Sequence, residues 1–226
     1  MSARRAAAGP LLLRIDGAQP LSAETVGAVA AICVQAEDAA GAAVVVVRAT
    51  GAPADGWADR LTTKLVNRWE QVLRRFERLP ATTIAAVPDD CGGPALDALL
   101  ATDHRIASRT ARLVLPTQAG LVWPGMALYR LARQAPHAAA VRRAALFGAA
   151  IDIADALAVH LVHEVTDDLD AAVEAAAARA ATLSGTELAV RRQLALDAPT
   201  VGFEEALGTH LAAVDRTLRL AAETAS

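Results

Sequence analysis

Residues 82–107 read TTIAAVPDDCGGPALDALLATDHRIA, and this stretch decides the fold. The β-rich run at 83–87 predicts a strand, and the proline, acids and glycines of 88–93 predict a turn. Pro94 suits the first turn of a helix, which we expect to follow at once. The run at 105–107 then predicts another short strand. A strand, a glycine turn, a helix and a strand in succession are typical of an α/β core.

The chain before this stretch shows the same alternation of strands and helices. A short apolar run at 11–15 and four valines at 44–47 predict two strands. The unbroken valine run is typical of a strand that is buried on both faces of a parallel sheet. Apolar residues at helical spacing then predict a long helix that ends at Pro80.

The C-terminal part of the chain is mostly helical after Ala138, with one expected strand at 161–165. The last helix carries apolar residues at spacings of three and four over 207–218, so it has an apolar face. That face suits either a contact between subunits or packing against the chain's own core. We expect two parts, an α/β core at 1–184 and a helical C-terminal extension at 185–226.

The composition excludes several classes of protein. Of the 226 residues 54% are hydrophobic and 21% charged, and the net charge is −3, so the chain should fold and nucleic acid is disfavoured as a partner. No apolar run approaches the ~20 residues that span a bilayer, and residues 1–16 make a poor signal peptide. Cys33 and Cys91 are too few for a disulfide framework, and nothing near them has metal-ligand spacing. We expect a reduced cytoplasmic protein without a metal site.

The glycine turn has a chemical consequence. The first amides of a helix have no partners within the helix and point outward, and the helix dipole adds to their positive potential. A glycine turn that leads into a helix at Pro94 can therefore stabilise an oxyanion formed from a thioester. A tight structural turn would have the same sequence, so this pattern alone leaves both interpretations open.

Three segments carry a resemblance to a known family: TIAAV at 83–87, CGGPALD at 91–97 and DHRIA at 103–107. They resemble the signature of the crotonase superfamily, the enoyl-CoA hydratases and isomerases, and the similarity covers most of residues 11–220. It is closest to the enoyl-CoA hydratase-like members of 3,5-dihydroxyphenylglycine biosynthesis. The resemblance implies a crotonase (ClpP-like) ββα spiral core with a helical C-terminal extension, assembled into trimers or hexamers.

In that family two backbone amides form an oxyanion hole for the carbonyl of an acyl-CoA. The residues that the resemblance assigns to this hole are Gly56, Trp57, Ala58, Gly92, Gly93 and Pro94. The second donor position falls on Pro94, which has no amide hydrogen and cannot donate. The donor must therefore shift to Gly93 or Ala95, or the hole is incomplete.

Hydratases of the family also use two glutamates that activate and position water. The resemblance places the first at Asp97, shorter by one methylene, and the second at Thr117, which cannot act as a base near neutral pH. Asp97 lies one helical turn after Gly93 and on the same face. If that face looks into a pocket, burial would raise the pKa of Asp97 toward useful values. Otherwise Asp97 is an exposed helical carboxylate.

The remaining reactive groups favour simpler roles. Asp89 and Asp90 are typical turn residues, and Cys91 has no histidine nearby in sequence that would activate its thiol. The histidines lack metal-ligand spacing. Trp123 and Tyr129 are expected to pack in the core or in an interface, with an aromatic-substrate pocket as the alternative.

These features favour a hydratase or dehydratase that acts on a CoA thioester or an enzyme-bound thioester, with no other cofactor. The resemblance implies a role in the dehydration and aromatisation that give a 3,5-dihydroxyphenylacetyl thioester, beside a type III polyketide synthase. A degenerate member that only binds and stimulates that synthase is the alternative. Isomerisation and thioester hydrolysis also stay open, because a fold does not determine a function.

Overall fold

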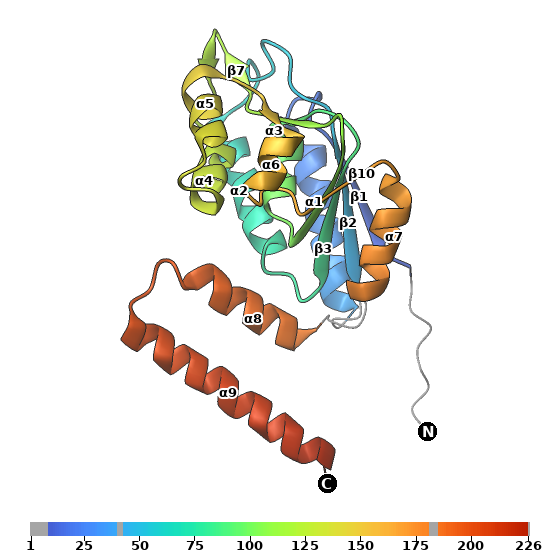
Figure 1. Cartoon of the computed structure of the whole chain (residues 1–226), viewed down its shortest axis with the longest axis vertical. Coiled ribbons are helices and arrows are strands. Elements are labelled where there is room, and N and C mark those ends of the chain that lie inside the picture. Colours follow the sequence, from blue (N-terminus) through green and yellow to red (C-terminus); the bar gives the residue numbers. More distant parts are fainter. Residues whose placement is uncertain (1–8, 40–42, 181–184, 226) are drawn as a thin grey trace.

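A five-stranded parallel sheet forms the centre of the computed structural model, which describes residues 9–39, 43–180 and 185–225. The strand order is β1-β2-β3-β5-β10, and β1, β2 and β3 lie side by side in Figure 1. The strands are β1 (Leu11–Asp16), β2 (Val44–Thr50), β3 (Thr82–Val87), β5 (His104–Ser108) and β10 (Glu164–Thr166). The four strands predicted before residue 110 are confirmed.

Three helices make the connections between successive strands: α1 (Ala23–Asp38), α2 (Thr63–Phe76) and α3 (Gly93–Leu100). Ser22 begins α1 and Thr62 begins α2, and each hydroxyl accepts a hydrogen bond from an amide of the first turn. These caps satisfy amides that have no partner within the helix. The long helix predicted before Pro80 is α2, which ends slightly earlier than expected.

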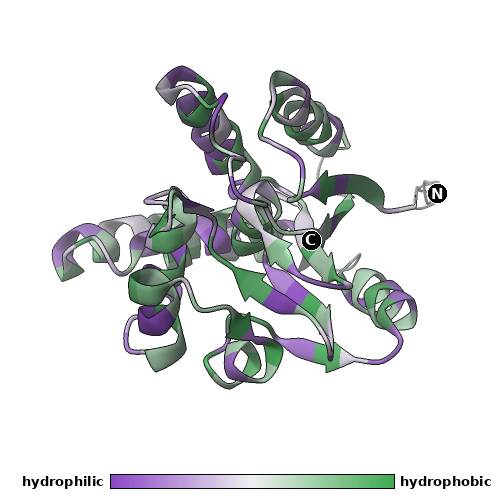
Figure 2. Ribbon diagram, turned by 90° about the horizontal axis from the view of Figure 1, so that it is seen from above, coloured by the Kyte–Doolittle hydropathy of each residue, from purple (hydrophilic) through white to green (hydrophobic). Residues whose placement is uncertain are grey.

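The sheet is buried on both faces, as the valine run of β2 predicted. Val45 and Val47 pack into the larger core with α1, α2 and α3. Val44 and Val46 face the other side, where α7 (Leu169–Ala180) covers the sheet. Figure 2 shows that the helices around the sheet carry both hydrophobic and hydrophilic residues, as expected of helices with one buried side.

Smaller elements form a second layer beside the main sheet. A three-stranded sheet has the order β4-β6-β9, and a hairpin pairs β7 with β8. The elements are β4 (Cys91–Gly92), β6 (Arg112–Val114), β7 (Thr117–Gln118), β8 (Leu121–Val122), α4 (Met126–Gln134), α5 (Ala139–Phe147), β9 (Ile151–Asp152) and α6 (Ile153–Ala158). The expected turn at 88–93 thus contains the short strand β4, because it pairs in parallel with β6.

The strand predicted at 161–165 is displaced toward the C-terminus. Leu161 and Val162 are buried, but their amides donate to the carbonyl of Ala156 and close the end of α6. His160 precedes them with a φ of 60°, a left-handed conformation that usually favours glycine. The apolar run therefore ends a helix, and pairing with β5 begins only at Glu164.

The C-terminal extension consists of α8 (Thr186–Asp197) and α9 (Phe203–Ala225). Arg192 attaches α8 to the core, because it donates to Asp103 and to the Ala81 carbonyl. The helix α9 packs against α8 (Figure 1), so it does not fold back on the core. Its exposed large apolar residues are Phe203, Leu207, Leu211, Val214, Leu218 and Leu220.

The boundary expected at residue 184 lies outside the described residues. Within the described part of the chain, no helix is both long and apolar enough to cross a membrane.

Candidate active site

Three glycines bring separate chain segments into backbone contact at the carboxyl ends of β1, β2 and β4. The Gly92 amide donates to the Gly51 carbonyl at 2.9 Å. A Cβ atom at Gly17 would lie 2.1 Å from the Gly92 oxygen and 2.5 Å from the Gly51 oxygen. No side chain fits there, so glycine at position 17 is required for the glycine turn to reach the sheet.

The residues of the glycine turn differ in what their amides can do. The Gly92 amide is engaged with Gly51, and Pro94 has no amide hydrogen. Gly93 begins α3 with a φ of 52° and packs so closely on Pro53 that a Cβ would lie 2.7 Å from its ring. Gly93 and Ala95 are therefore the residues of this turn whose amides could face an oxyanion.

The loop at 56–58, where the other oxyanion donor is expected, lies against the β7–β8 hairpin. The ring of Trp57 packs edge-on against Trp123 with centroids 5.5 Å apart. The Gln118 side chain donates to Asp59 at 2.8 Å and joins the hairpin to the same loop. Thr117 precedes Gln118 in β7 and is half-buried. The fold thus gathers the loop at 56–58 and Thr117 on one side of the molecule.

Asp97 is mostly buried between α2, α3 and α4, so it is not an exposed helical carboxylate. The Trp69 ring nitrogen donates to its Oδ2 at 3.1 Å, and Arg130 Nη1 lies 3.7 Å from its Oδ1. Burial and the nearby Glu70 carboxylate raise the pKa of Asp97 to about 7, although Arg130 and the Trp69 hydrogen bond oppose that rise. A carboxyl that exchanges a proton near neutral pH is suited to acid–base catalysis.

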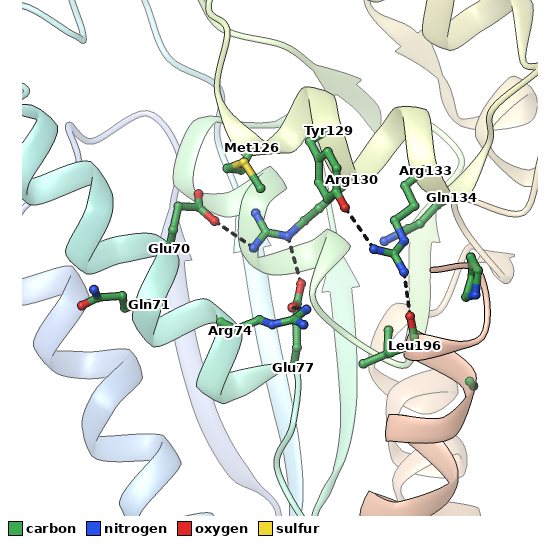
Figure 3. A pocket seen from close by; sticks show the side chains of 12 residues that line it. Glu70, Gln71, Arg74, Glu77, Met126, Tyr129, Arg130, Arg133, Gln134 and Leu196 are labelled. Atoms are coloured by element: carbon green, nitrogen blue, oxygen red, sulfur yellow. Dashed lines mark hydrogen bonds and ion pairs between the residues drawn. The ribbon is translucent and has the colours of Figure 1, made fainter. Parts of the chain in front are cut away.

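Arg130 holds two further carboxylates beside Asp97. Its guanidinium donates to Glu70 at 2.9 Å and to Glu77 at 3.0 Å, and its side chain is only 7% exposed (Figure 3). Although burial disfavours its charge, Glu70 and Glu77 raise the pKa of Arg130 above its usual value. Arg130 is therefore a permanent cation in this cluster.

A cavity of about 710 Å³ lies next to this cluster, between α2, α4 and α8 (Figure 3). It is lined by Glu70, Gln71, Arg74, Glu77, Met126, Tyr129, Arg130, Arg133, Gln134, Ala195, Leu196 and Pro199. Tyr129 thus lies on a cavity, whereas Trp123 packs against Trp57. This cavity is not lined by Asp97, by Thr117 or by any of the six residues expected at the oxyanion hole.

The reactive groups around the glycine turn have structural partners. Asp89 accepts hydrogen bonds from Thr50 and from the Gly51 amide, and Asp90 pairs with Arg112. Cys91 is fully buried, and burial raises the pKa of its thiol far above the usual range. These partners agree with the structural roles that the sequence context indicated.

Two histidines pack together at the end of the sheet. His104 and His163 stack with ring centroids 5.4 Å apart, and His163 Nδ1 accepts the Arg105 amide. Burial lowers the pKa of His163 to about 4, so the ring is neutral near pH 7. Among the residues that the structure describes, no group of three or more His, Cys, Asp and Glu side chains could hold a metal ion.

The raised pKa of Asp97 predicts how stability depends on pH. The unfolded chain releases this proton near pH 3.8 and the folded chain near pH 7, so the folded state holds an extra proton between these values. Stability should fall as pH rises through this window, by roughly 2–4 kcal/mol. Urea unfolding of wild type and Asp97→Asn at pH 5 and pH 8 tests this. The free energy of unfolding of Asp97→Asn minus that of wild type should be larger at pH 8 than at pH 5. If this difference does not change with pH, the assignment is contradicted.

Comparisons with known proteins show the family to which this chain belongs. Residues 49–217 match the Enoyl-CoA hydratase/isomerase family. A protein of Amycolatopsis orientalis described as an enoyl-CoA-hydratase is 50% identical over 211 residues, which are 93% of this chain and 97% of that protein. The chain belongs to the enoyl-CoA hydratase/isomerase family.

Solved structures extend the family likeness to the fold. A crystal structure of an enoyl-CoA hydratase/isomerase from Marinobacter aquaeolei matches with a TM-score of 0.74 at 17% identity, over 92% of this chain and 87% of that one. A family protein from Silicibacter pomeroyi matches with a TM-score of 0.73 at 19% identity, over 92% and 95%. The crotonase fold, an α/β core with a helical C-terminal region, is confirmed.

Sequence reasoning missed the residues that surround Asp97 in this enoyl-CoA hydratase/isomerase family member. Trp69 and Glu70 come from α2, Glu77 directly follows that helix, and Arg130 comes from α4. One signal was present: Glu70 and Glu77 are seven residues apart, which places them on one side of a helix. The sequence could not show that Arg130 would be buried between them.

Proposed function

We propose that this protein adds water to, or removes water from, the acyl chain of a thioester. The buried Asp97, with its pKa near 7 and one helical turn from the glycine turn, is the observation that carries the proposal. An acid–base group must hold a proton in one step and release it in the next, and a pKa near the working pH suits both steps. Asp97 stands where the resemblance places a catalytic carboxylate.

In the direction of hydration, the Asp97 carboxylate takes a proton from a water molecule that attacks C3 of an enoyl thioester. The electrons of the C2–C3 double bond move toward the carbonyl, whose oxygen becomes an enolate oxyanion. An amide of Gly93 or Ala95, with one from residues 56–58, would stabilise that charge. C2 then takes the proton from Asp97. Thr117 would hold the water by a hydrogen bond, and dehydration follows the same steps in reverse.

The finer part of the proposal concerns the substrate and its supplier. We infer that the thioester is an intermediate on the way to a 3,5-dihydroxyphenylacetyl thioester in glycopeptide antibiotic biosynthesis, released by a type III polyketide synthase. The resemblance of the glycine turn to the dihydroxyphenylglycine members supports this part. The proposal includes a cytoplasmic location and no cofactor beyond the thioester. It also includes assembly into trimers or hexamers, which the exposed apolar face of α9 supports.

The purified protein, incubated with short 3-hydroxyacyl-CoA and enoyl-CoA thioesters, tests the chemistry. We expect the acyl chain to lose or gain the mass of one water molecule, as followed by mass spectrometry. Adding a type III polyketide synthase and its malonyl-CoA substrate tests the finer part, because the aromatic product should then increase. No change of mass with any thioester, free or bound to the synthase, would contradict the enzymatic proposal.

One observation favours a second candidate, a partner protein that stimulates the synthase without catalysis. The position where the resemblance places the second oxyanion donor is occupied by Pro94, which cannot donate, and the neighbouring Gly92 amide is engaged with Gly51. Titration of the synthase with wild type, Asp97→Asn and Thr117→Val separates the two candidates. A partner acting by binding alone would stimulate equally well in all three forms.

A further inference from the structure

Asp97 is held by side chains from two other helices. Trp69 on α2 donates to its Oδ2 at 3.1 Å, and Arg130 on α4 lies 3.7 Å from its Oδ1. The Asp97 side chain is 17% exposed and that of Arg130 is 7% exposed. Neither Oδ1 nor Nη1 has a hydrogen-bond partner among the described residues, so these two atoms face each other as a loose ion pair. The carboxyl group therefore has a defined direction, with Oδ2 toward the Trp69 donor and Oδ1 toward the Arg130 guanidinium.

The charges in this cluster do not balance. The guanidinium of Arg130 lies 2.9 Å from the carboxylate of Glu70, 3.0 Å from that of Glu77 and 3.7 Å from that of Asp97. Three negative charges against one positive charge are unfavourable in a buried place, and the usual outcome is that one carboxyl keeps its proton. Asp97 is the most distant of the three from the guanidinium, so it is the group that gains least from ionising.

Glu70 and Glu77 bind different nitrogens of the Arg130 guanidinium, and so lie differently with respect to Asp97. Glu70 accepts from Arg130 Nη2, which forms one fork of the guanidinium with Nη1, the atom that faces Asp97. Glu77 accepts from Nε, on the opposite side of the guanidinium from Nη1. The negative charge of Glu70 therefore acts on Asp97 more directly than that of Glu77 does.

We propose that Trp69, Arg130 and Glu70 are positioning residues for Asp97: Trp69 sets the direction of its carboxyl group, and the Arg130–Glu70 pair sets the pH at which it exchanges its proton. This inference rests on the proposed function only for its effect on the reaction. The charged and titratable groups that act on Asp97 are Glu70, Arg130 and the neutral thiol of Cys91, and Glu77 joins them through its ion pair with Arg130.

The test compares Glu70→Gln with its matched control Glu77→Gln. Each variant removes one negative charge that is paired with the Arg130 guanidinium, and each leaves an amide oxygen that can accept the hydrogen bond from Arg130. Two readouts are followed against pH: the ¹³C signal of the Asp97 carboxyl in aspartate-labelled protein, assigned by its loss in Asp97→Asn, and the rate of thioester hydration. In Glu70→Gln the midpoint of both should move down by about one pH unit, and in Glu77→Gln by much less. Glu70→Asp, which keeps the charge, should restore most of the wild-type midpoint.

Trp69→Phe tests the directional part, because it keeps an aromatic ring but removes the donor. We expect kcat to fall about tenfold or more with little change in KM. A midpoint that stays in place in Glu70→Gln, or that moves equally in Glu77→Gln, would overturn the inference. If the ¹³C midpoint moves as expected but no variant hydrates any thioester, the inference holds and the proposed function fails.

Discussion

Asp97→Asn should lower the rate of thioester hydration by about 10²- to 10⁴-fold, the usual contribution of a positioned acid–base group. Asparagine has nearly the same size, and its carbonyl oxygen can still accept the hydrogen bond from Trp69. It cannot exchange a proton, so the loss would report chemistry and not packing. Steady-state rates at several pH values, with circular dichroism to show an unchanged fold, measure the effect.

Asp90→Asn is the matched control for this variant. Asp90 lies in the same stretch of sequence, but its carboxylate forms a surface ion pair with Arg112. We expect its hydration rate to stay within about twofold of wild type, because exposed ion pairs contribute little. Equal hydration rates in wild type, Asp90→Asn and Asp97→Asn would remove Asp97 from the mechanism.

Arg130→Met should lower the free energy of unfolding by about 3–5 kcal/mol, since it leaves buried carboxylates without their cation. The three groups affected are Glu70, Glu77 and Asp97, which surround one guanidinium. Methionine retains much of the apolar side-chain length, so the loss should come mainly from charge. Urea unfolding at pH 7 measures it, and the loss should shrink at low pH, where the carboxyl groups are protonated.

Arg109→Met provides the comparison for an exposed pair. Arg109 and Asp167 are 66% and 75% exposed, so this pair should contribute less than about 1 kcal/mol. A loss in Arg130→Met as small as that in Arg109→Met would mean that Arg130 does not compensate buried charge. The positioning role of Arg130 would then lose its physical basis.

The sequence was informative wherever a local pattern decides the structure. The four valines of β2 predicted a strand buried on both faces, because alternate side chains of a strand point to opposite sides. The run at 161–165 misled, because apolar residues that close a helix and apolar residues of a strand look alike. His160, with its left-handed backbone, is the residue that separates the two cases.

In the candidate site, too, the sequence predicted the local arrangement but not the surroundings of the side chain. The sequence placed Asp97 one turn into a helix after a glycine turn, and that placement is correct. It left open whether the side chain is exposed or buried, because this depends on which helix covers that face. Residues 28 positions before it and 33 after it, Trp69 and Arg130, provide the answer.

The sequence by itself determined the family and the frame of the site: the segment 82–107 gives a strand, a glycine turn and a helix, since backbone preferences and apolar periodicity act locally. Only the tertiary structure decided the chemistry of that frame. It engages the Gly92 amide with Gly51 and encloses Asp97 with Trp69 and Arg130. Solvation and charge at a carboxyl depend on its neighbours in space, and chain folding brings those neighbours from distant parts of the sequence.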